Sequence, residues 1–316
     1  MADTEEELIT RLRHPEVAER QLALMALEDV ASVDAVDALI GAARDGDPTV
    51  RRLAIGLLED LGDGRAATVL IAALEDQVEE VRVVAEAALR ELRDPVAAAA
   101  LVAAVGHPSA AVRRAVIVAL REHRDPRAVA SLIGALEDED ASVRREAVVT
   151  LAYQRRAETL PALRGRLRDA DADVRRLALG SLGFFHGPAL LPDFIAATAD
   201  GDWRVRAEAA IVLGRAALSA GVPALIGALE DEFWQVRKEA ATALGRLRAP
   251  AARPALVKLL GSEVADLRKV AAAALGEIGA SEALDALRAL AADPDVEVRK
   301  AAARAIGRLE SAQASG

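Results

Sequence analysis

Length, composition and charge narrow the classes of protein that this sequence can encode. The 316 residues include 50 acidic and 40 basic side chains, giving a net charge of −10, and no cysteine. Without cysteine there are no disulfides, thiol nucleophiles or thiolate metal sites. Residues 1–150 hold 29 acidic and 17 basic side chains, whereas a groove for nucleic acid needs a basic excess to neutralise phosphates. We therefore expect no nucleic-acid partner.

Neither the start of the chain nor its most apolar run indicates a membrane protein. The start, MADTEEELITRL, is acidic and lacks the apolar core of a secretory signal. The run PVAAAALVAAVG at 95–106 is too short to span a bilayer and fits the first helix of a repeat. We expect a cytoplasmic protein with no membrane partner.

The chain is an array of repeats. A degenerate copy occupies about residues 5–45, and nine clear copies follow at intervals of 31 residues, each marked by Arg after Val or, once, after Leu. These pairs are Val50-Arg51, Val81-Arg82, Val112-Arg113, Val143-Arg144, Val174-Arg175, Val205-Arg206, Val236-Arg237, Leu267-Arg268 and Val298-Arg299. Self-similarity at a spacing of this size is typical of solenoids. We predict one domain over residues 1–310 and a flexible tail at 311–316.

Each repeat contains two helical patterns. In the second, counted in steps from the residue before the marker Arg, apolar residues recur at steps 0, 4, 7, 8 and 11, one stripe on an α-helix. Step 8 is apolar in all nine copies, and we expect burial in particular of Leu120, Leu151, Leu182, Leu213 and Leu244. No strand pattern appears. The sequence predicts an all-α, right-handed α-solenoid of about ten helix pairs of 31 residues.

The repeat unit resembles a known one. Its pattern, D-x-x-x-x-V-R-x-x-A-A-x-A-L-G, is similar to the short HEAT repeat of the phycobilin-lyase type and covers nearly the whole chain. The resemblance implies a stack of HEAT-like helix pairs whose second helices line a concave surface, where partners usually bind. It does not fix an activity, since one fold serves many functions.

Two sets of polar residues are candidates for chemistry. An Asp precedes the marker Arg by six residues in seven of nine copies. Because residues common to every repeat serve stacking, we interpret these pairs as ties between turns rather than as an anion-binding ladder. The four histidines are His14, His107, His123 and His186. They share no metal-ligand spacing, and none is followed by the Glu that iron-dependent hydroxylases built from similar repeats use. We expect no metal, no cofactor and no catalytic residue.

Function in an array is expected where the copies differ on an exposed face. On the second helix that face holds steps −2, 2, 6 and 10, each about one turn from the next. Step 2 is basic in seven of nine copies, including Arg145, Arg176 and Lys238, and step 6 supplies a small or apolar floor that includes Val149 and Ile211. We predict that this basic row is substantially exposed. The marker arginines one step earlier, Arg144, Arg175 and Arg237, should instead have carboxylate partners near the turns.

The aromatic side chains point to a site on this face. Tyr153 and Phe184 stand at step 10, and Trp203 and Trp234 stand at step −2 of consecutive repeats. Large aromatic residues on an exposed, partly apolar face are typical binding anchors. We predict that these four side chains border one concavity, with Gly180 leaving a notch beside Phe184. Alternatively, the two Trp side chains fold over their own turns and cover the core.

The other three aromatic residues divide between core and turn. Phe185 and Phe194 fall at core steps, and we assign them to packing. Phe233 belongs to a turn between helices and fits either role.

Three functions fit these observations. The leading hypothesis is a non-enzymatic scaffold that binds a protein segment with acidic and apolar side chains in the groove of the central repeats. A second, implied by the resemblance, is a bilin-lyase-like protein that holds a tetrapyrrole through its aromatic residues and Arg row. A third is a HEAT-like DNA glycosylase using Asp202, Trp203 and Trp234, which the net charge disfavours.

Overall fold

The protein is helical throughout the residues that its computed structural model describes, which are 3–185, 188–217 and 219–314. These residues form 20 α-helices and no strand, with short 3-10 turns leading into most first helices of the pairs. The all-α fold predicted from the sequence is confirmed.

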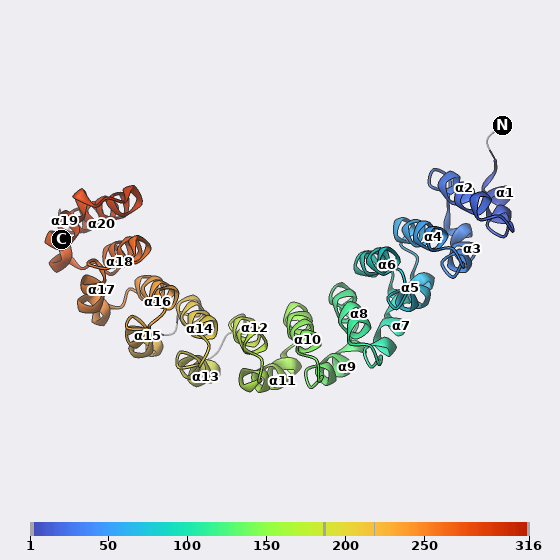
Figure 1. Cartoon of the computed structure of the whole chain (residues 1–316). Coiled ribbons are helices and arrows are strands. Elements are labelled where there is room, and N and C mark those ends of the chain that lie inside the picture. Colours follow the sequence, from blue (N-terminus) through green and yellow to red (C-terminus); the bar gives the residue numbers. More distant parts are fainter. Residues whose placement is uncertain (1–2, 186–187, 218, 315–316) are drawn as a thin grey trace. The chain divides into compact units, whose positions relative to one another are not determined.

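The chain forms two compact units, Met1–Ala162 and Leu163–Gly316 (Figure 1). The first contains α1 (Glu5–Arg11), α2 (Val17–Leu27), α3 (Val36–Ala42), α4 (Pro48–Leu61), α5 (Ala67–Ala73), α6 (Glu79–Glu91), α7 (Ala98–Ala104), α8 (Ala110–His123), α9 (Ala128–Ala135) and α10 (Ala141–Gln154). Helix α11 (Leu160–Gly165) crosses the boundary. The second contains α12 (Ala172–Leu182), α13 (Leu191–Ala197), α14 (Trp203–Arg215), α15 (Val222–Ala228), α16 (Trp234–Arg246), α17 (Arg253–Leu259), α18 (Ala265–Ile278), α19 (Leu284–Ala289) and α20 (Val296–Ala314).

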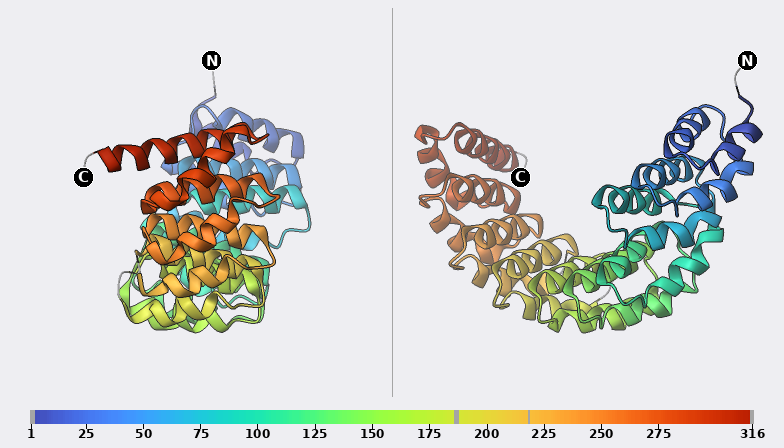
Figure 2. Two further views of the ribbon diagram at one scale, coloured as in Figure 1. Left: turned by 90° about the vertical axis from the view of Figure 1, so that its left-hand side faces the viewer. Right: turned by 45° about the vertical axis from the view of Figure 1, so that its right-hand side comes forward.

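Within each unit the helices form two layers. The odd-numbered helices are the first members of the pairs and form one layer, and the even-numbered second helices form the other (Figure 1). Figure 2 shows the same alternation from two further directions. Neighbouring second helices pack along each other far more extensively than neighbouring first helices do. The second-helix layer therefore lies on the inner side of the bend within each unit.

The repeated apolar stripe forms the core. The step-8 residues Leu120, Leu151, Leu182, Leu213 and Leu244 are all fully buried, as predicted. Phe194 is also buried, in agreement with its assignment to packing, whereas Phe185 is half-buried. Burying a leucine side chain stabilises a protein by roughly 1.5–3 kcal/mol, so the regular stripe supplies similar stabilisation to every repeat.

Local signals begin and end the second helices. At α4 the Asp47 carboxylate accepts hydrogen bonds from the backbone N–H groups of Thr49 and Val50, both at 3.0 Å, and Pro48 occupies the first helical position. These features satisfy donors that a helix leaves unpaired at its start. The helix ends at Gly62, whose φ of 62° is a left-handed conformation that favours glycine.

Glycines let the second helices of the second unit approach closely. A Cβ added at Gly214 would lie 2.7 Å from Ala243 Cβ, and one at Gly245 would lie 2.9 Å from Ala274 Cα. Both distances are shorter than real Cβ atoms adopt, so these positions require glycine. The helices α14, α16 and α18 are packed backbone against small side chain along this line.

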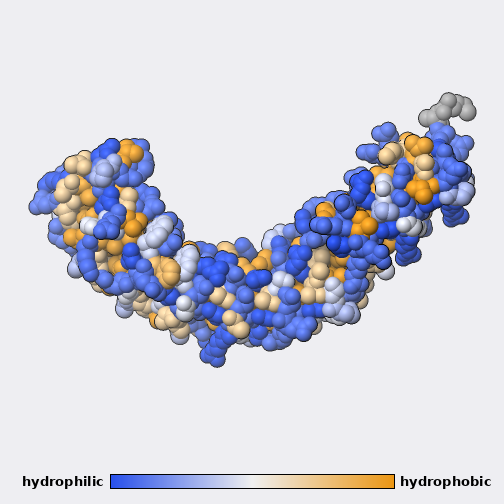
Figure 3. Space-filling model, viewed as in Figure 1, coloured by the Kyte–Doolittle hydropathy of each residue, from blue (hydrophilic) through white to orange (hydrophobic). Residues whose placement is uncertain are grey.

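The last helix extends beyond the predicted array. Of the tail expected at residues 311–316, the first four residues continue α20, and the last two lie outside the described residues. Hydrophilic residues dominate the face of both units that Figure 3 presents, and apolar residues appear there in small separate patches. No helix in the described part of the chain is long and apolar enough to cross a membrane.

Candidate functional site

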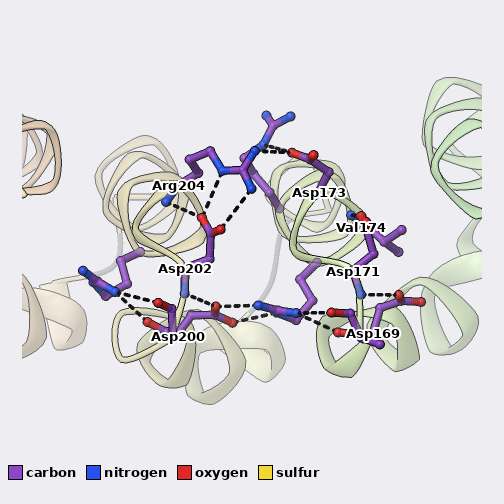
Figure 4. Close-up of polar contacts among 12 residues, drawn as sticks. Asp169, Asp171, Asp173, Val174, Asp200, Asp202 and Arg204 are labelled. Atoms are coloured by element: carbon purple, nitrogen blue, oxygen red, sulfur yellow. Dashed lines mark hydrogen bonds and ion pairs between the residues drawn. The ribbon is translucent and has the colours of Figure 1, made fainter. Parts of the chain in front are cut away.

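A row of Arg–Asp pairs, which we term the Arg–Asp ladder, joins the turns of successive repeats (Figure 4). Nη1 of Arg175 donates to the backbone oxygens of Asp169 and Ala170 in its own turn, at 2.8 and 3.2 Å. Its Nε and Nη2 donate to the two carboxylate oxygens of Asp200 in the next turn, both at 2.8 Å. The same arrangement recurs at Arg51–Asp76, Arg113–Asp138, Arg206–Asp231 and Arg268–Asp293. The interpretation of these residues as ties between turns is confirmed.

The ladder carboxylates are ionised and fully engaged. Asp200 also accepts a hydrogen bond from the backbone N–H of Asp202 at 2.8 Å. Burial opposes the charge of Asp200, but the hydrogen bonds from Arg175 and Asp202 outweigh it and hold the pKa of Asp200 below its usual value. Such bidentate, charge-assisted pairs are among the stronger polar interactions in proteins. Their role is to hold successive repeats together.

Asp202, the acid of the glycosylase hypothesis, is engaged at the start of α14. Its Oδ1 accepts from the backbone N–H of Arg204 at 2.8 Å, and its Oδ2 accepts from Nη2 of the same residue at 2.9 Å (Figure 4). Hydrogen bonds from the Arg204 side chain lower the pKa of Asp202. This carboxylate is thus an ionised helix cap.

The histidines also lie in structural positions. His14 and His107 take the place of the ladder Asp, and the Nδ1 of each accepts from a backbone N–H two residues on, at 3.2 Å. His123 Nε2 lies 3.0 Å from the backbone oxygen of Leu92, and burial lowers the pKa of this imidazole. His186 lies outside the described residues. Within the described ranges, no group of three or more potential metal ligands occurs.

The structure divides the predicted aromatic residues into exposed and half-buried ones. Tyr153 is 42% exposed and Phe184 is 53% exposed, and both stand at the ends of second helices. Trp203 and Trp234 are only half-buried rather than exposed. The expectation that all four occupy exposed steps is therefore wrong for the two Trp side chains. Trp203 is covered in part because its ring stacks on Phe233.

Phe184 and Arg215 form the most exposed aromatic feature of the second unit. The Arg215 guanidinium carbon lies 4.4 Å from the centre of the Phe184 ring, within the range of a cation–π interaction. Nη2 of Arg215 also donates to the backbone oxygen of Gly180 at 3.1 Å, which fixes the guanidinium over the ring. The pair presents a flat, apolar and positively charged surface to solvent.

The notch predicted at Gly180 is filled. A Cβ added at Gly180 would lie 2.9 Å from Oε1 of Glu208, which reaches over from α14. Burial raises the pKa of Glu208, and the charges of Arg215 and Arg176 oppose that rise. The prediction of an open notch beside Phe184 is wrong because the repeat that supplies Arg215 also supplies a carboxylate, Glu208, about two helical turns before it.

Trp203 makes its ring contact with a residue that sequence analysis left undecided. Its ring stacks on Phe233 at a centroid distance of 5.6 Å and an interplanar angle of 15°. The guanidinium carbon of the ladder residue Arg206 lies over the Phe233 ring, 5.6 Å from the ring centre. Phe233 is 37% exposed, so this stack covers part of the ladder and still presents apolar surface. Phe233, which fits either role by its sequence position, therefore forms part of an exposed aromatic surface with Trp203.

The two aromatic features of the second unit lie at opposite ends of its second helices. Trp203 begins α14 and Arg215 ends it, and the helix has 13 residues. At a rise of 1.5 Å per residue, these ends are about 18 Å apart. Between them Ile211, predicted as floor, is half-buried. The second unit therefore has an aromatic stack at one rim of the second-helix face and the Phe184–Arg215 pair at the other.

The basic row is less available than expected. Arg145, Arg176 and Lys238 are all half-buried, so the prediction of substantial exposure is wrong. Carboxylates attract the last two, with Arg176 Nε 3.5 Å from Asp173 and Lys238 Nζ 3.8 Å from Glu239. Asp173 lies three residues before Arg176, a spacing at which side chains meet on a helix, and the step pattern did not include it.

The prediction that the marker arginines have carboxylate partners is confirmed in part. Arg175 has Asp200 as its carboxylate partner, and Arg144 donates to the backbone oxygens of Asp138 and Glu139 in its own turn. Arg237 donates to the backbone oxygens of Asp231 and Glu232. Twenty-five residues after Arg237 the chain has Ser262 instead of Asp, so the predicted carboxylate partner of Arg237 is missing.

Tyr153, Val149 and Arg145 belong to the first unit. The Tyr153 hydroxyl donates to Oε2 of Glu122 at 3.2 Å, and the Arg124 guanidinium lies 5.2 Å from the ring centre. Val149 is half-buried. Because the other predicted site residues belong to the second unit, the single concavity shared by all of them stays a prediction.

Sequence reasoning missed Glu208 and the contact of Arg215 with Phe184, and it left the role of Phe233 undecided. Reading each helix position separately does not show contacts between repeats. Glu208 contacts Gly180 of the preceding repeat, and Arg215 contacts Phe184 of the preceding repeat. The signal was present in the register, since Arg215 is the step-10 residue that follows Phe184 in the array.

Comparisons with known proteins agree with this architecture. HEAT repeats match residues 5–90, 68–149, 129–201, 191–274 and 261–315, and no curated protein matches the sequence. Among solved structures, an engineered protein aligns with 98% of this chain and 99% of its own, at 22% identity and a TM-score of 0.52.

Longer chains of known structure share the fold. The chain of a Kap95:Nup1 complex aligns with 99% of this chain at 16% identity and a TM-score of 0.67, and importin beta aligns with 96% at 18% identity and a TM-score of 0.63. This chain spans about half the length of these two, covering 52% and 50% of them. At such identities the likeness shows the fold alone. The matched repeats extend over nearly the whole sequence, and the chain belongs to the HEAT-repeat family.

Proposed function

We propose that the protein is a non-enzymatic scaffold that binds a segment of a partner protein on the second-helix face of its second unit. The observation that carries the proposal is Phe184, which is 53% exposed and is held under the Arg215 guanidinium. Aromatic and Arg side chains are the residue types most often found as anchors in interfaces. Their positions are fixed before binding, so little side-chain entropy remains to be lost on association.

The dimensions suit a short extended segment. About 18 Å separates the two ends of α14, and an extended chain advances about 3.3 Å per residue. Some six residues would therefore cross the face from the Trp203–Phe233 stack to the Phe184–Arg215 pair. Apolar side chains at the two ends of such a segment would each meet an aromatic ring.

Charge favours carboxylates near one rim. Arg215 and Arg246 are the exposed last residues of α14 and α16. Acidic side chains beside the apolar anchor would find these two cations, while the half-buried Arg176 and Lys238 contribute less. The expected partner segment is apolar at both ends and acidic at the end that meets Phe184.

The family supports a binding role without specifying it. Among the proteins that share the fold, Kap95p binds RanGDP and Kap95 forms a complex with Nup1, and those partners belong to those proteins. The proposal also includes a cytoplasmic location and a repeat of the phycobilin-lyase type, and both of these rest on the sequence alone.

Affinity capture from cells that make the protein tests the proposal. Phe184→Ser combined with Phe233→Ser should remove the specific partner, since truncating an interface anchor weakens binding by about 2 kcal/mol or more. The matched control is Val33→Ser with Val96→Ser, two apolar residues of the first unit that are 59% and 64% exposed.

The outcomes are distinct. A partner lost in the first variant and kept in the control supports the proposal, and equal capture by both variants contradicts it. An absorbance band that shifts when the protein is mixed with a bilin would instead favour the tetrapyrrole alternative.

A further inference from the structure

The Arg–Asp ladder has an unfilled position in the second unit. Nη1 of Arg237 donates to the backbone oxygens of Asp231 and Glu232 at 2.6 and 3.1 Å, as ladder arginines do elsewhere. Where the next carboxylate belongs, the chain has Ser262. Over residues 3–185, 188–217 and 219–314, no carboxylate lies within ion-pair distance of the Arg237 guanidinium. Its Nε and Nη2, which we term the fork, are therefore without the acceptor that five other ladder arginines have.

Ser262 performs only part of the role of a ladder Asp. Its Oγ accepts from the backbone N–H of Val264 at 3.2 Å, the bond that a ladder carboxylate makes within its own turn. Its backbone oxygen accepts from Nη1 of Arg268 at 2.9 Å, so the turn itself is intact. The side chain is too short and lacks the second oxygen needed to reach the Arg237 fork.

A cavity lies at this position. It has a volume of 230 Å³, and its lining includes Arg237, Ser262, Lys258 and the apolar side chains of Leu229 and Leu259. Equivalent cavities lie beside the filled Arg113–Asp138 and Arg175–Asp200 pairs. The cavity at Ser262 therefore adjoins the fork and gives room for the group that carries a carboxylate.

The acidic residues beside the cavity do not fill the fork. Asp231 is held by the Arg206 fork at 2.6 and 3.0 Å. Glu230 accepts from Lys258 Nζ at 3.0 and 3.3 Å on the exposed side of the cavity. Arg237 is thus the one lining cation, within the described residues, that has only backbone acceptors.

We propose that Arg237 and the cavity at Ser262 form a binding site for a carboxylate group from outside the ladder. The five filled positions give the expected geometry, with Nε–O distances of 2.6 to 2.8 Å and Nη2–O distances of 2.7 to 3.0 Å. The planar guanidinium fork matches a carboxylate in two parallel bonds. N–H donors that are half-buried and lack a strong acceptor favour the binding of a ligand that supplies such an acceptor. The site goes beyond the partner surface proposed above and does not depend on it.

The carboxylate has two sources that share this chemistry, a small free carboxylate and an acidic side chain of a protein. The test records the Nε–H resonance of Arg237 in the full-length protein by NMR, assigned through its loss in Arg237→Gln. Sodium acetate is titrated against sodium chloride at constant ionic strength. A second titration uses acetyl-Gly-Glu-Gly-amide, with acetyl-Gly-Gln-Gly-amide as its uncharged counterpart.

The site predicts a saturable shift of the Arg237 resonance with acetate. In Ser262→Asp the fork should be filled from within the chain, so the resonance should start near those of the filled ladder arginines and no longer respond. The matched control Lys258→Gln, which alters the neighbouring cation and leaves the fork, should retain the response.

A response to the Glu peptide but not the Gln peptide supports a protein carboxylate, and a response to acetate alone supports a small free one. If acetate leaves the resonance unmoved, or moves it equally in Ser262→Asp, the proposal is overturned. Circular dichroism of each variant verifies that it is folded.

Discussion

The two units are built from one repeat but differ at two adjacent positions of the second helix. Step 9 in the first unit is occupied by Glu59, Arg90, Arg121 and Ala152, and in the second by Gly183, Gly214, Gly245, Gly276 and Gly307. In the first unit the long side chains occupy the space between neighbouring second helices, as where Arg121 of α8 donates to Glu146 of α10 at 2.8 Å. In the second unit, helices α14, α16, α18 and α20 make more extensive contacts with one another.

Step 10 differs in the same sense. The first unit carries Asp60, Glu91, Glu122 and Tyr153 at this step, and the second begins with Phe184, Arg215 and Arg246. Both units keep the same buried leucines and the same ladder. Helix spacing and surface chemistry are therefore set at steps 9 and 10, independently of the residues that make the fold.

Truncating a buried step-8 leucine should have the largest effect on the free energy of unfolding, and this effect should be equal in the two units. Leu89→Ala in the first and Leu213→Ala in the second each remove a fully buried step-8 side chain. Each should lower the free energy of unfolding by roughly 2–5 kcal/mol, measured by denaturant unfolding. A large loss in one unit with almost none in the other would show that the cores are not equivalent.

Loss of a ladder carboxylate should have the next largest effect on the free energy of unfolding. Asp200→Asn removes the charge that Arg175 holds and should cost roughly 1.5–3 kcal/mol at neutral pH. The pKa of Asp200 is lowered in the folded protein, so the unfolded chain binds the proton more tightly. This contribution is therefore present above the unfolded pKa and is lost as pH falls through the folded pKa.

The difference between wild type and Asp200→Asn should accordingly shrink in acid, which denaturant unfolding at several pH values measures. Asp285→Asn is the matched control, because this side chain is 98% exposed and its ion pair with Arg288 should contribute little. An equal loss in both variants would contradict the structural role of the ladder.

The glycine positions give a smaller effect that separates the units directly. Gly214→Ala places a Cβ 2.7 Å from Ala243 Cβ and should destabilise by roughly 1–3 kcal/mol through overpacking. Gly307→Ala, the same step with nothing within 4 Å, should instead stabilise by roughly 0.5–1 kcal/mol because alanine is the better helix former. Thermal unfolding measures both, and the same sign for the two variants would refute the close approach of α14 and α16.

Much of the fold followed from the sequence, and less of the site did. The spacing of the marker arginines and the step-8 leucines predicted the helix pairs because each repeat must bury the same stripe. Gly180 was expected to leave an open notch, but the side chain of Glu208 from the next repeat fills it. The stack of Trp203 on Phe233 was not foreseen because Phe233 lies in the turn of the next repeat, before α16. Contacts between repeats depend on side-chain directions that a list of steps does not contain.

Substitutions on the proposed binding surface should have the smallest effect on stability. Phe184→Ser removes a half-exposed ring and one cation–π contact, and should cost no more than about 1 kcal/mol in unfolding free energy. Thermal unfolding beside the wild type measures it. A loss comparable to that of Leu213→Ala would make Phe184 part of the core.

Photo-crosslinking in the cells that make the protein tests the central claim most directly, namely that Phe184 and Arg215 are covered by a partner protein. A photoreactive benzoylphenylalanine at position 184 is compared with the same residue at position 96, where Val96 of the first unit is 64% exposed. A discrete protein adduct is expected at 184, absent at 96 and weakened when Arg215→Ser is added. Adducts of equal yield at both positions, or none at 184, would contradict it.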